Sequence, residues 1–159
     1  AKGGQLMIYR PAVAEDFEQL ARLRWDFRTE YTQDPPPIPW EAFRQMMLDF
    51  LRQAFESGEW TVWVAEEEGQ IVAQAFIRRI QKVPRPAKVQ PAFGYVTNVF
   101  TRPAYRNRGV GAELMRCVQA WAKAKGLEML VLWPSKRAVS FYRRAGFVHP
   151  TEAMEFPME

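Results

Sequence analysis

Apolar residues recur in the first third of the chain at the spacing of amphipathic helices. The first set follows steps of four, three, seven and four residues along one helical face: Val13, Phe17, Leu20, Phe27 and Tyr31. A second helix is predicted over residues 40–54, whose apolar positions share one face and which Gly58 follows. Four prolines in residues 34–39 predict a stiff loop between the two helices.

From Trp60 onward the apolar period changes from helical to alternating. Residues 60–65 alternate between two faces, residues 67–70 include a glycine turn, and residues 71–80 continue as a second apolar run. This pattern predicts a β-hairpin. A further strand is predicted over residues 93–101, and the three prolines of residues 81–91 predict a surface loop before it.

The C-terminal part alternates between helical and extended patterns. A helix is predicted over residues 110–125 and another over residues 136–145, each followed by glycine. Residues 128–133 are apolar at nearly every position, which predicts a strand in the centre of the sheet. A last strand is predicted from Phe147 toward Met158.

A short strand is also predicted over residues 7–10, before Pro11. The resulting order, β α α β β β α β α β, joins some strands by a hairpin and others through helices. It predicts the α+β class, with a mixed central sheet covered by helices on both faces in three layers. A chain of 159 residues has the length of one domain, and we expect that domain over residues 7–159. Residues 1–6 are interpreted as a cloning remnant or disordered leader before Met7.

Composition and charge narrow the class of protein. A hydrophobic content of 48% is typical of a globular fold. Cys117 is the single cysteine, which excludes an internal disulfide framework and fits a reducing compartment. It falls on the apolar face of a predicted helix. No apolar run approaches the roughly 20 residues of a membrane span, so we expect a cytoplasmic protein without membrane contact. The net charge of +4 suits an anionic ligand.

The segment from Arg106 to Gly111 stands between a predicted strand and a predicted helix. The start of a helix leaves backbone N–H groups unpaired, and its dipole favours negative charge. Gly109 and Gly111 let the backbone approach a ligand closely, and Arg106 and Arg108 add positive charge. The pattern predicts a phosphate cradle, although a tight turn from strand to helix also needs glycine for structural reasons alone.

Arg-x-x-Gly-x-Gly at Arg106–Gly111 resembles the acetyl-CoA pyrophosphate motif of the GCN5-related N-acetyltransferases (GNAT). Ile8–Ala12 is similar to the first strand of that family, and Val99–Tyr105 is similar to the approach to its pyrophosphate loop. Ala138–Phe147 resembles its second coenzyme A motif, in which a helix with Phe-Tyr ends at Gly-Phe. The matches follow in order over about residues 7–150.

The resemblance implies an acetyl-CoA-dependent N-acetyltransferase in which a primary amine attacks the thioester directly. Two parallel strands would splay apart around the pantetheine, and a backbone N–H would stabilise the oxyanion. Tyr142 would be the general acid that protonates the thiolate. No metal is expected. The residues implied to hold the cofactor are Val99, Phe100, Thr101, Arg106, Asn107, Arg108, Gly109, Val110, Gly111, Tyr142 and Ser135, the last where the family often has asparagine.

The base that deprotonates the amine is left open. Glu30 is the candidate we assign to catalysis, with Asp26 and Asn98 as further candidates; a solvated helix face also explains both carboxylates. Arg24 lies on an apolar face, where it is either a substrate contact or a side chain that extends to solvent. His149 is expected to be structural or exposed.

The acceptor is also left open between a polyamine-like molecule, an antibiotic, an amino acid, and a protein N-terminus or lysine. An acyl-CoA-sensing module without catalysis is one alternative. A nucleic-acid binder is another, but the phosphates of coenzyme A account for the arginines, and we expect no nucleic-acid partner. A homodimer that pairs through residues 151–158 is one expected assembly. Residues 81–91 are expected to be mobile and to gate the acceptor.

Overall fold

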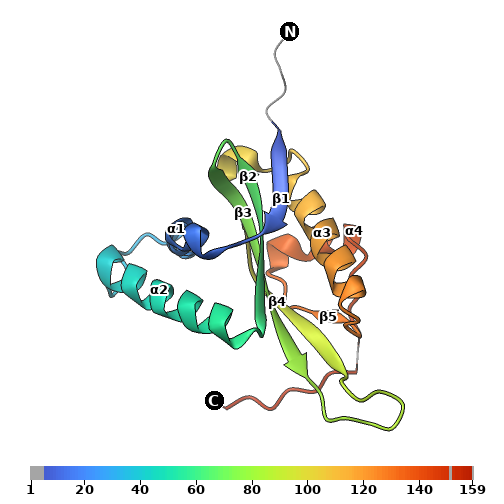
Figure 1. Cartoon of the computed structure of the whole chain (residues 1–159). Helices are drawn as coiled ribbons and strands as arrows, with labels where there is room; N and C mark the ends of the chain where they lie inside the picture. The colour runs from blue at the N-terminus through green and yellow to red at the C-terminus, as the bar shows by residue number, and fades with distance from the viewer. Residues whose placement is uncertain (1–5, 151, 159) are drawn as a thin grey trace.

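The computed structural model describes residues 6–150 and 152–158, whose strands form one five-stranded sheet (Figure 1). The expectation for residues 1–6 therefore falls almost wholly outside the described chain. The sheet order is β1-β2-β3-β4-β5, with antiparallel neighbours up to β4 and a parallel pair at the end. The strands are β1 (Met7–Pro11), β2 (Trp60–Glu67), β3 (Gln70–Gln81), β4 (Ala92–Thr101) and β5 (Leu130–Val131).

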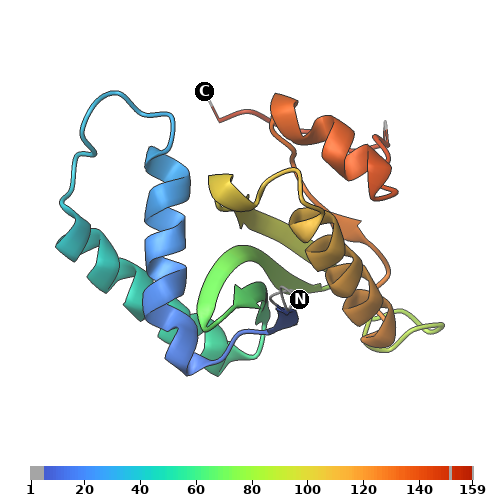
Figure 2. The ribbon, with the colours of Figure 1, turned by 90° about the horizontal axis from the view of Figure 1, so that it is seen from above.

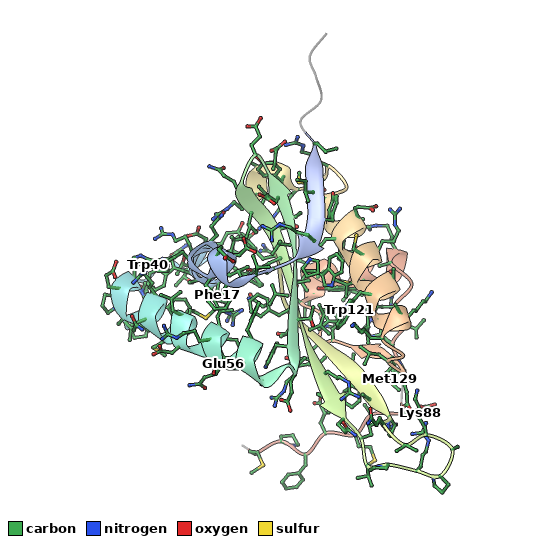
Figure 3. The ribbon with its side chains drawn as sticks, in the orientation of Figure 1. Phe17, Trp40, Glu56, Lys88, Trp121 and Met129 are labelled. Atoms are coloured by element: carbon green, nitrogen blue, oxygen red, sulfur yellow. The ribbon has the colours of Figure 1, made fainter. Side chains whose placement is uncertain are left out.

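Helices cover both faces of this sheet, which confirms the predicted α+β class and its three layers. The helices are α1 (Phe17–Thr29), α2 (Trp40–Ser57), α3 (Val110–Ala124) and α4 (Val139–Arg144), with short 3₁₀ turns η1 (Ala14–Asp16), η2 (Pro103–Tyr105) and η3 (Lys136–Ala138). Seen from above, α1 and α2 lie on one side of the sheet and α3 and α4 on the other (Figure 2). Phe17 and Trp40 mark the first side, and Trp121 marks the second (Figure 3).

Alternate side chains of the hairpin strands β2 and β3 point to opposite faces of the sheet, as predicted, and so belong to two hydrophobic cores. Val62 and Phe76 face α1 and α2, whereas Ala73 and Ala75 face α3 and α4. Burying one large apolar side chain contributes about 1.5–3 kcal/mol, so both helix layers are held mainly by this packing. The small alanines on the second face let α3 approach the sheet closely.

A partly buried ion pair fixes the start of α1. Arg10 at the end of β1 donates from Nη1 and Nη2 to the Asp16 carboxylate at 2.7 and 2.9 Å, and from Nε to Glu66 Oε2 at 2.9 Å. The Val13 N–H also donates to Asp16 Oδ2 at 2.8 Å. The Arg10 guanidinium lowers the pKa of Asp16. This network joins β1, β2 and the start of α1, and so sets the direction of the helix whose far end reaches the site.

The structure corrects two predictions for the C-terminal strands. The apolar segment 128–133 contributes only the two residues of β5, at the edge of the sheet and not in its centre. Met129 and Trp133 beside β5 are 53% and 68% exposed, because no strand of the described chain pairs with the outer edge of β5. Residues 147–150 and 152–158 form no strand, so nothing in the described chain supports dimer pairing through 151–158, which stays a prediction.

Candidate active site

Strand β4 consists of two halves that differ in their neighbours. In the paired half, Ala92–Tyr95, Gly94 lies opposite Leu130 and Tyr95 opposite Val131 of β5. A Cβ on Gly94 would lie 2.7 Å from Leu130 Cδ2, so glycine permits this close pairing. In the open half, Val96–Thr101, the described residues pair only with β3. The two parallel strands therefore diverge after Tyr95, as the resemblance implied.

The open half of β4 also contains a β-bulge. Gln74 of β3 lies opposite Phe100, and Phe76 lies opposite Thr97, so β4 has one more residue than β3 in this interval. Asn98 lies inside it with a φ of 52°, in the left-handed region that asparagine tolerates better than most residues. A bulge bends the strand and redirects its side chains and backbone groups. Here it does so beside the opening between the strands.

This opening, which we call the β4–α4 hollow, has a volume of about 240 Å³. Three segments that are distant in sequence meet around it. They are the end of α1 (Arg24, Phe27, Arg28), the bulged part of β4 (Val96–Val99), and the stretch from the end of β5 into α4 (Pro134, Ser135, Ala138, Tyr142). Of the residues expected to hold the cofactor, the structure brings Val99, Ser135 and Tyr142 together here.

Tyr142 is the buried residue of α4 and lies on the wall of the hollow. Phe141 and Phe147 pack edge-on against its ring at 5.1 and 5.6 Å between centroids. Burial raises the pKa of Tyr142 to about 12, and its hydroxyl forms no hydrogen bond with any described residue. The phenol therefore keeps its proton at neutral pH and has that proton available for a bound molecule.

The start of α3 leaves backbone donors available, as predicted for a phosphate cradle. The first hydrogen bond of the helix joins the Glu113 N–H to the Gly109 carbonyl at 3.0 Å, so the N–H groups of residues 110–112 have no acceptor within the helix. Gly109 has a φ of 79° and Asn107 a φ of 60°. A Cβ on Gly111 would lie 3.4 Å from the Phe141 ring, at ordinary contact distance, so packing alone does not require glycine there and its role toward the cofactor stays a prediction.

The two arginines of this loop have different surroundings. Arg106 donates from Nη1 and Nη2 to Glu30 at 2.6 and 2.8 Å and from Nε to the Thr101 carbonyl at 3.0 Å. Its backbone N–H also donates to the Pro103 carbonyl at 3.2 Å. Arg108, by contrast, is exposed and lies over the Tyr105 ring. Of the two guanidinium groups, Arg108 is the one more available to a ligand.

Glu30, the candidate base, is the partner of Arg106 and does not line the hollow. Hydrogen bonding to Glu30 raises the pKa of Arg106. Asp26 is engaged similarly, by Arg102 at 2.8 Å and by Arg22 at 3.2 Å. Both carboxylates therefore join the end of α1 to its surroundings in this structure, and their assignment to proton transfer stays a prediction.

Other expected site residues contribute in different ways. The Phe100 side chain turns away from the cofactor side and stacks on Phe27 at 5.0 Å, which leaves only its backbone for a ligand. Val110 is buried in the core beneath α3. His149 is exposed and lines a second, apolar hollow of about 690 Å³ beside β5, which shares Pro134 and Tyr142 with the β4–α4 hollow.

Arg24 and Arg28 on α1 also line the β4–α4 hollow, and sequence reasoning left Arg28 out. Their separation of four residues, which places both on one helical face, was the signal that could have identified it. Arg24 Nη1 donates to Asn98 Oδ1 at 3.1 Å. Burial, with the nearby Arg28 charge, lowers the pKa of Arg24.

The described residues contain neither a metal-ligand cluster nor a helix that could span a membrane. No group of three or more His, Cys, Asp or Glu side chains lies close enough together to hold a metal ion. None of the helices in residues 6–150 and 152–158 combines the length and the apolar character that crossing a bilayer requires.

Comparison with known proteins places these features in one family. The sequence pattern of the Acetyltransferase (GNAT) family matches residues 17–147. A predicted acetyltransferase of Clostridium acetobutylicum, solved with acetyl-CoA, is 25% identical with a TM-score of 0.79 and covers 96% of this chain and 97% of its own. A GCN5-related N-acetyltransferase of Ralstonia eutropha JMP134 is 28% identical with a TM-score of 0.76, over 96% of this chain and 99% of its own.

A curated relative adds a match in sequence. Glucosamine 6-phosphate N-acetyltransferase of Trypanosoma brucei brucei is 28% identical over 86 residues, which are 54% of this chain and 56% of that protein. An uncharacterized N-acetyltransferase of Methanocaldococcus jannaschii is 34% identical over 55 residues, which are 33% of this chain and 24% of that protein. The chain thus spans only part of the length of both curated relatives, 24% of this one and 56% of the first.

Proposed function

Because the chain belongs to the Acetyltransferase (GNAT) family, we propose that it transfers an acetyl group from acetyl-CoA to a primary amine. The observation that carries this proposal is the β4–α4 hollow. It opens where β4 loses its parallel neighbour, and buried Tyr142, whose hydroxyl has no hydrogen-bond partner among the described residues, is one of the residues that line it. The chemistry of acyl transfer needs a backbone site for a carbonyl and a proton donor for a thiolate, and this region offers both.

The residues around the start of α3 suit the phosphates of coenzyme A. The free N–H groups of residues 110–112 and the exposed Arg108 favour an anion at this helix end. The hollow is the space for the pantetheine arm, with Val99 on one side and Ser135 on the other. Bound there, acetyl-CoA supplies an acetyl group activated as a thioester.

The chain then orients the thioester and supplies a proton. Backbone groups of the open half of β4 that face the hollow have no neighbouring strand, so they are available to hold the thioester carbonyl and to stabilise the negative charge that develops on its oxygen. The Tyr142 hydroxyl donates to the departing sulfur. Its pKa of about 12 keeps the hydroxyl protonated across the neutral range.

Removal of a proton from the amine is the least defined step. No Asp or Glu is among the described residues that line the hollow. Glu30 would act as the base only after its pair with Arg106 opens. The relative named for glucosamine 6-phosphate gives one acceptor to test, beside amino acids, polyamines and protein amines.

Thermal unfolding with and without acetyl-CoA tests the cofactor assignment. Gly109→Asn and Gly109→Asp are a matched pair, because both side chains tolerate the left-handed φ of Gly109 and only aspartate adds negative charge. A ligand at about 100 times its Kd stabilises the fold by about 2.7 kcal/mol. We expect acetyl-CoA to raise the midpoint of the wild type most and of Gly109→Asp least.

Two results would contradict this assignment: no shift of the wild type at millimolar acetyl-CoA, or equal shifts of the two variants. Thiol release with an amine panel then separates an enzyme from a module that only senses acyl-CoA. Stabilisation by acetyl-CoA without release of thiol for any amine would favour the sensing module.

A further inference from the structure

The α1 side of the β4–α4 hollow carries positive charge. Arg24 and Arg28 lie one helical turn apart and both line the hollow, and no Asp or Glu is among the described residues around it. The remaining lining residues are apolar or neutral. A molecule that enters from this side therefore meets two guanidinium groups and no carboxylate.

The arginines near the end of α1 differ in their partners. Arg106 and Arg102 each have a carboxylate, Glu30 at 2.6 Å and Asp26 at 2.8 Å. Arg24 is more deeply placed than an ordinary surface arginine, yet no described carboxylate lies within ion-pair distance of it or of Arg28. Its only hydrogen-bond acceptor among the described side chains is the neutral amide oxygen of Asn98, at 3.1 Å.

Partial burial of the Arg24 charge without a carboxylate partner destabilises the fold unless a bound anion balances that charge. A guanidinium has five N–H donors, and removing its charge from water without an opposite charge is unfavourable. Burial and the Arg28 charge lower the pKa of Arg24 and Tyr95 raises it, and the net shift is downward. The Phe27 ring lies 5.8 Å from the Arg24 guanidinium carbon, but no described carboxylate pairs with this guanidinium. Asn98 accepts from Arg24 while its own backbone lies in the strained conformation of the bulge. The bulge thus holds, on the wall of the hollow, a cation that no described carboxylate pairs with.

We propose, resting on the proposed acetyl transfer, that the acceptor is an amine that also carries a carboxylate or a phosphate, and that Arg24 and Arg28 bind this anionic group. Coenzyme A does not satisfy them, because the pantetheine arm is uncharged and the phosphates are assigned to the start of α3. Carboxylate and phosphate match the planar, bidentate donor geometry of arginine. Amino acids and phosphorylated amino sugars belong to this class. Polyamines and other polycations are disfavoured by repulsion from both arginines.

Matched acceptor pairs test the proposal. The pairs are glucosamine 6-phosphate with glucosamine and phenylalanine with phenylalaninamide, with spermidine as a polycation. Each is assayed by thiol release with wild type, Arg24→Gln and Arg22→Gln. Glutamine keeps a donor toward Asn98 but removes the charge. Arg22 lies on the same helix, is exposed and does not line the hollow, so its variant controls for loss of one charge from α1.

We expect the anionic member of at least one pair to have the higher kcat/KM with the wild type. Arg24→Gln should lower kcat/KM for that member by about 10- to 100-fold and for its neutral counterpart by less than about 3-fold. Arg22→Gln should keep the preference. A preference for neutral amines or spermidine, or equal losses for both members of a pair, would overturn the proposal.

A binding measurement decides the question if no panel member reacts. With acetyl-CoA saturating and ionic strength constant, inorganic phosphate or malonate should raise the unfolding midpoint of wild type and Arg22→Gln, but not of Arg24→Gln. Equal or absent shifts would overturn the inference. If succinyl-CoA, and not the anionic amine, shows the dependence on Arg24, the anion belongs to the acyl chain and the inference is likewise wrong. Stabilisation by acetyl-CoA is measured first, so failure of the proposed function is recognised separately.

Discussion

The two halves of β4 belong to one strand but have opposite surroundings. The paired half, Ala92–Tyr95, is bonded to β3 on one side and to the β5 segment on the other, including Glu128 N–H to Ala92 O and Gly94 N–H to Met129 O, both at 2.9 Å. The open half, Val96–Thr101, keeps β3 but has no strand on its other side among the described residues.

This difference explains why the candidate site residues lie beside the open half of β4. Backbone groups of the paired half are used by the sheet, so that half contributes stability and position. Beside the open half, Asn98 of the bulge, buried Tyr142 of α4 and Arg24 of α1 line the same hollow. Irregular backbone and unsatisfied charge destabilise a fold, and their concentration in one place is typical of a functional site.

The largest expected effect is that of a tyrosine beside the open half, compared with a tyrosine in the paired half. Tyr142→Phe removes the proton donor and should lower kcat by about 10²- to 10⁴-fold. Its unfolding midpoint should stay close to wild type, because the hydroxyl has no hydrogen-bond partner among the described residues. The control is Tyr95→Phe in the paired half, which does not line the hollow. Equal rates for the two variants would remove Tyr142 from the mechanism.

The next largest effect is expected from a substitution within the paired half itself, at Gly94. Gly94→Val places a side chain where even a Cβ would lie 2.7 Å from Leu130 and 3.0 Å from Ile77. Overpacking of this kind costs about 1–3 kcal/mol in the free energy of unfolding, measured by urea denaturation. Gly94→Ala should cost less, because the end of the Leu130 side chain has room to shift. A Gly94→Val protein as stable as wild type would show that the close approach of β4 and β5 is not a constraint.

A smaller effect measures the strain in the open half. Asn98→Gly and Asn98→Ala both remove the acceptor for Arg24, but only glycine adopts the φ of 52° without cost. Asn98→Ala should therefore be less stable than Asn98→Gly by about 1 kcal/mol in chemical denaturation. If alanine is as stable as glycine here, the bulge does not hold this backbone conformation in solution.

The smallest effect concerns the base of the loop before the paired half. Lys82 and Arg85 bind Glu128 at 2.9 and 2.5 Å and lower its pKa to about 2. Because the pKa is depressed, the contribution of Glu128 to stability is complete above its ordinary value near 4.3 and is lost as the pH falls toward 2. The midpoint difference between wild type and Glu128→Gln should thus be constant above about pH 5 and shrink in acid. Activity should not change.

Local patterns predicted most of the helices and the hairpin. The apolar face of residues 40–54 and the glycine after it correspond to α2, which ends at Gly58 with a left-handed φ of 70°. Helix and turn signals are local, so the sequence contains them directly. The place of β5 in the sheet depends on which strands pair with it. An apolar run indicates burial but does not indicate the pairing partners. That is why a strand expected in the centre lies at the edge.

The site was predictable in its motif but not in its charge pairing. The glycine loop and Tyr142 were located from residue order. The Arg106–Glu30 pair joins residues that are 76 positions apart, which no local pattern reveals. None of the residues of the loop 81–91 lines the β4–α4 hollow, and the expectation that this loop is mobile and gates the acceptor stays a prediction. Its basic side chains instead bind Glu128, near the opposite end of β4.

Hydrogen exchange with and without acetyl-CoA tests most directly whether the open half of β4 and the start of α3 hold the cofactor. Bound acetyl-CoA should slow exchange of backbone amides in residues 98–101 and 108–112. Amides of the paired half, Ala92–Tyr95, should change little, since β3 and β5 already protect them. Protection confined to the paired half or to the apolar hollow beside β5, or no protection at all, would contradict the account.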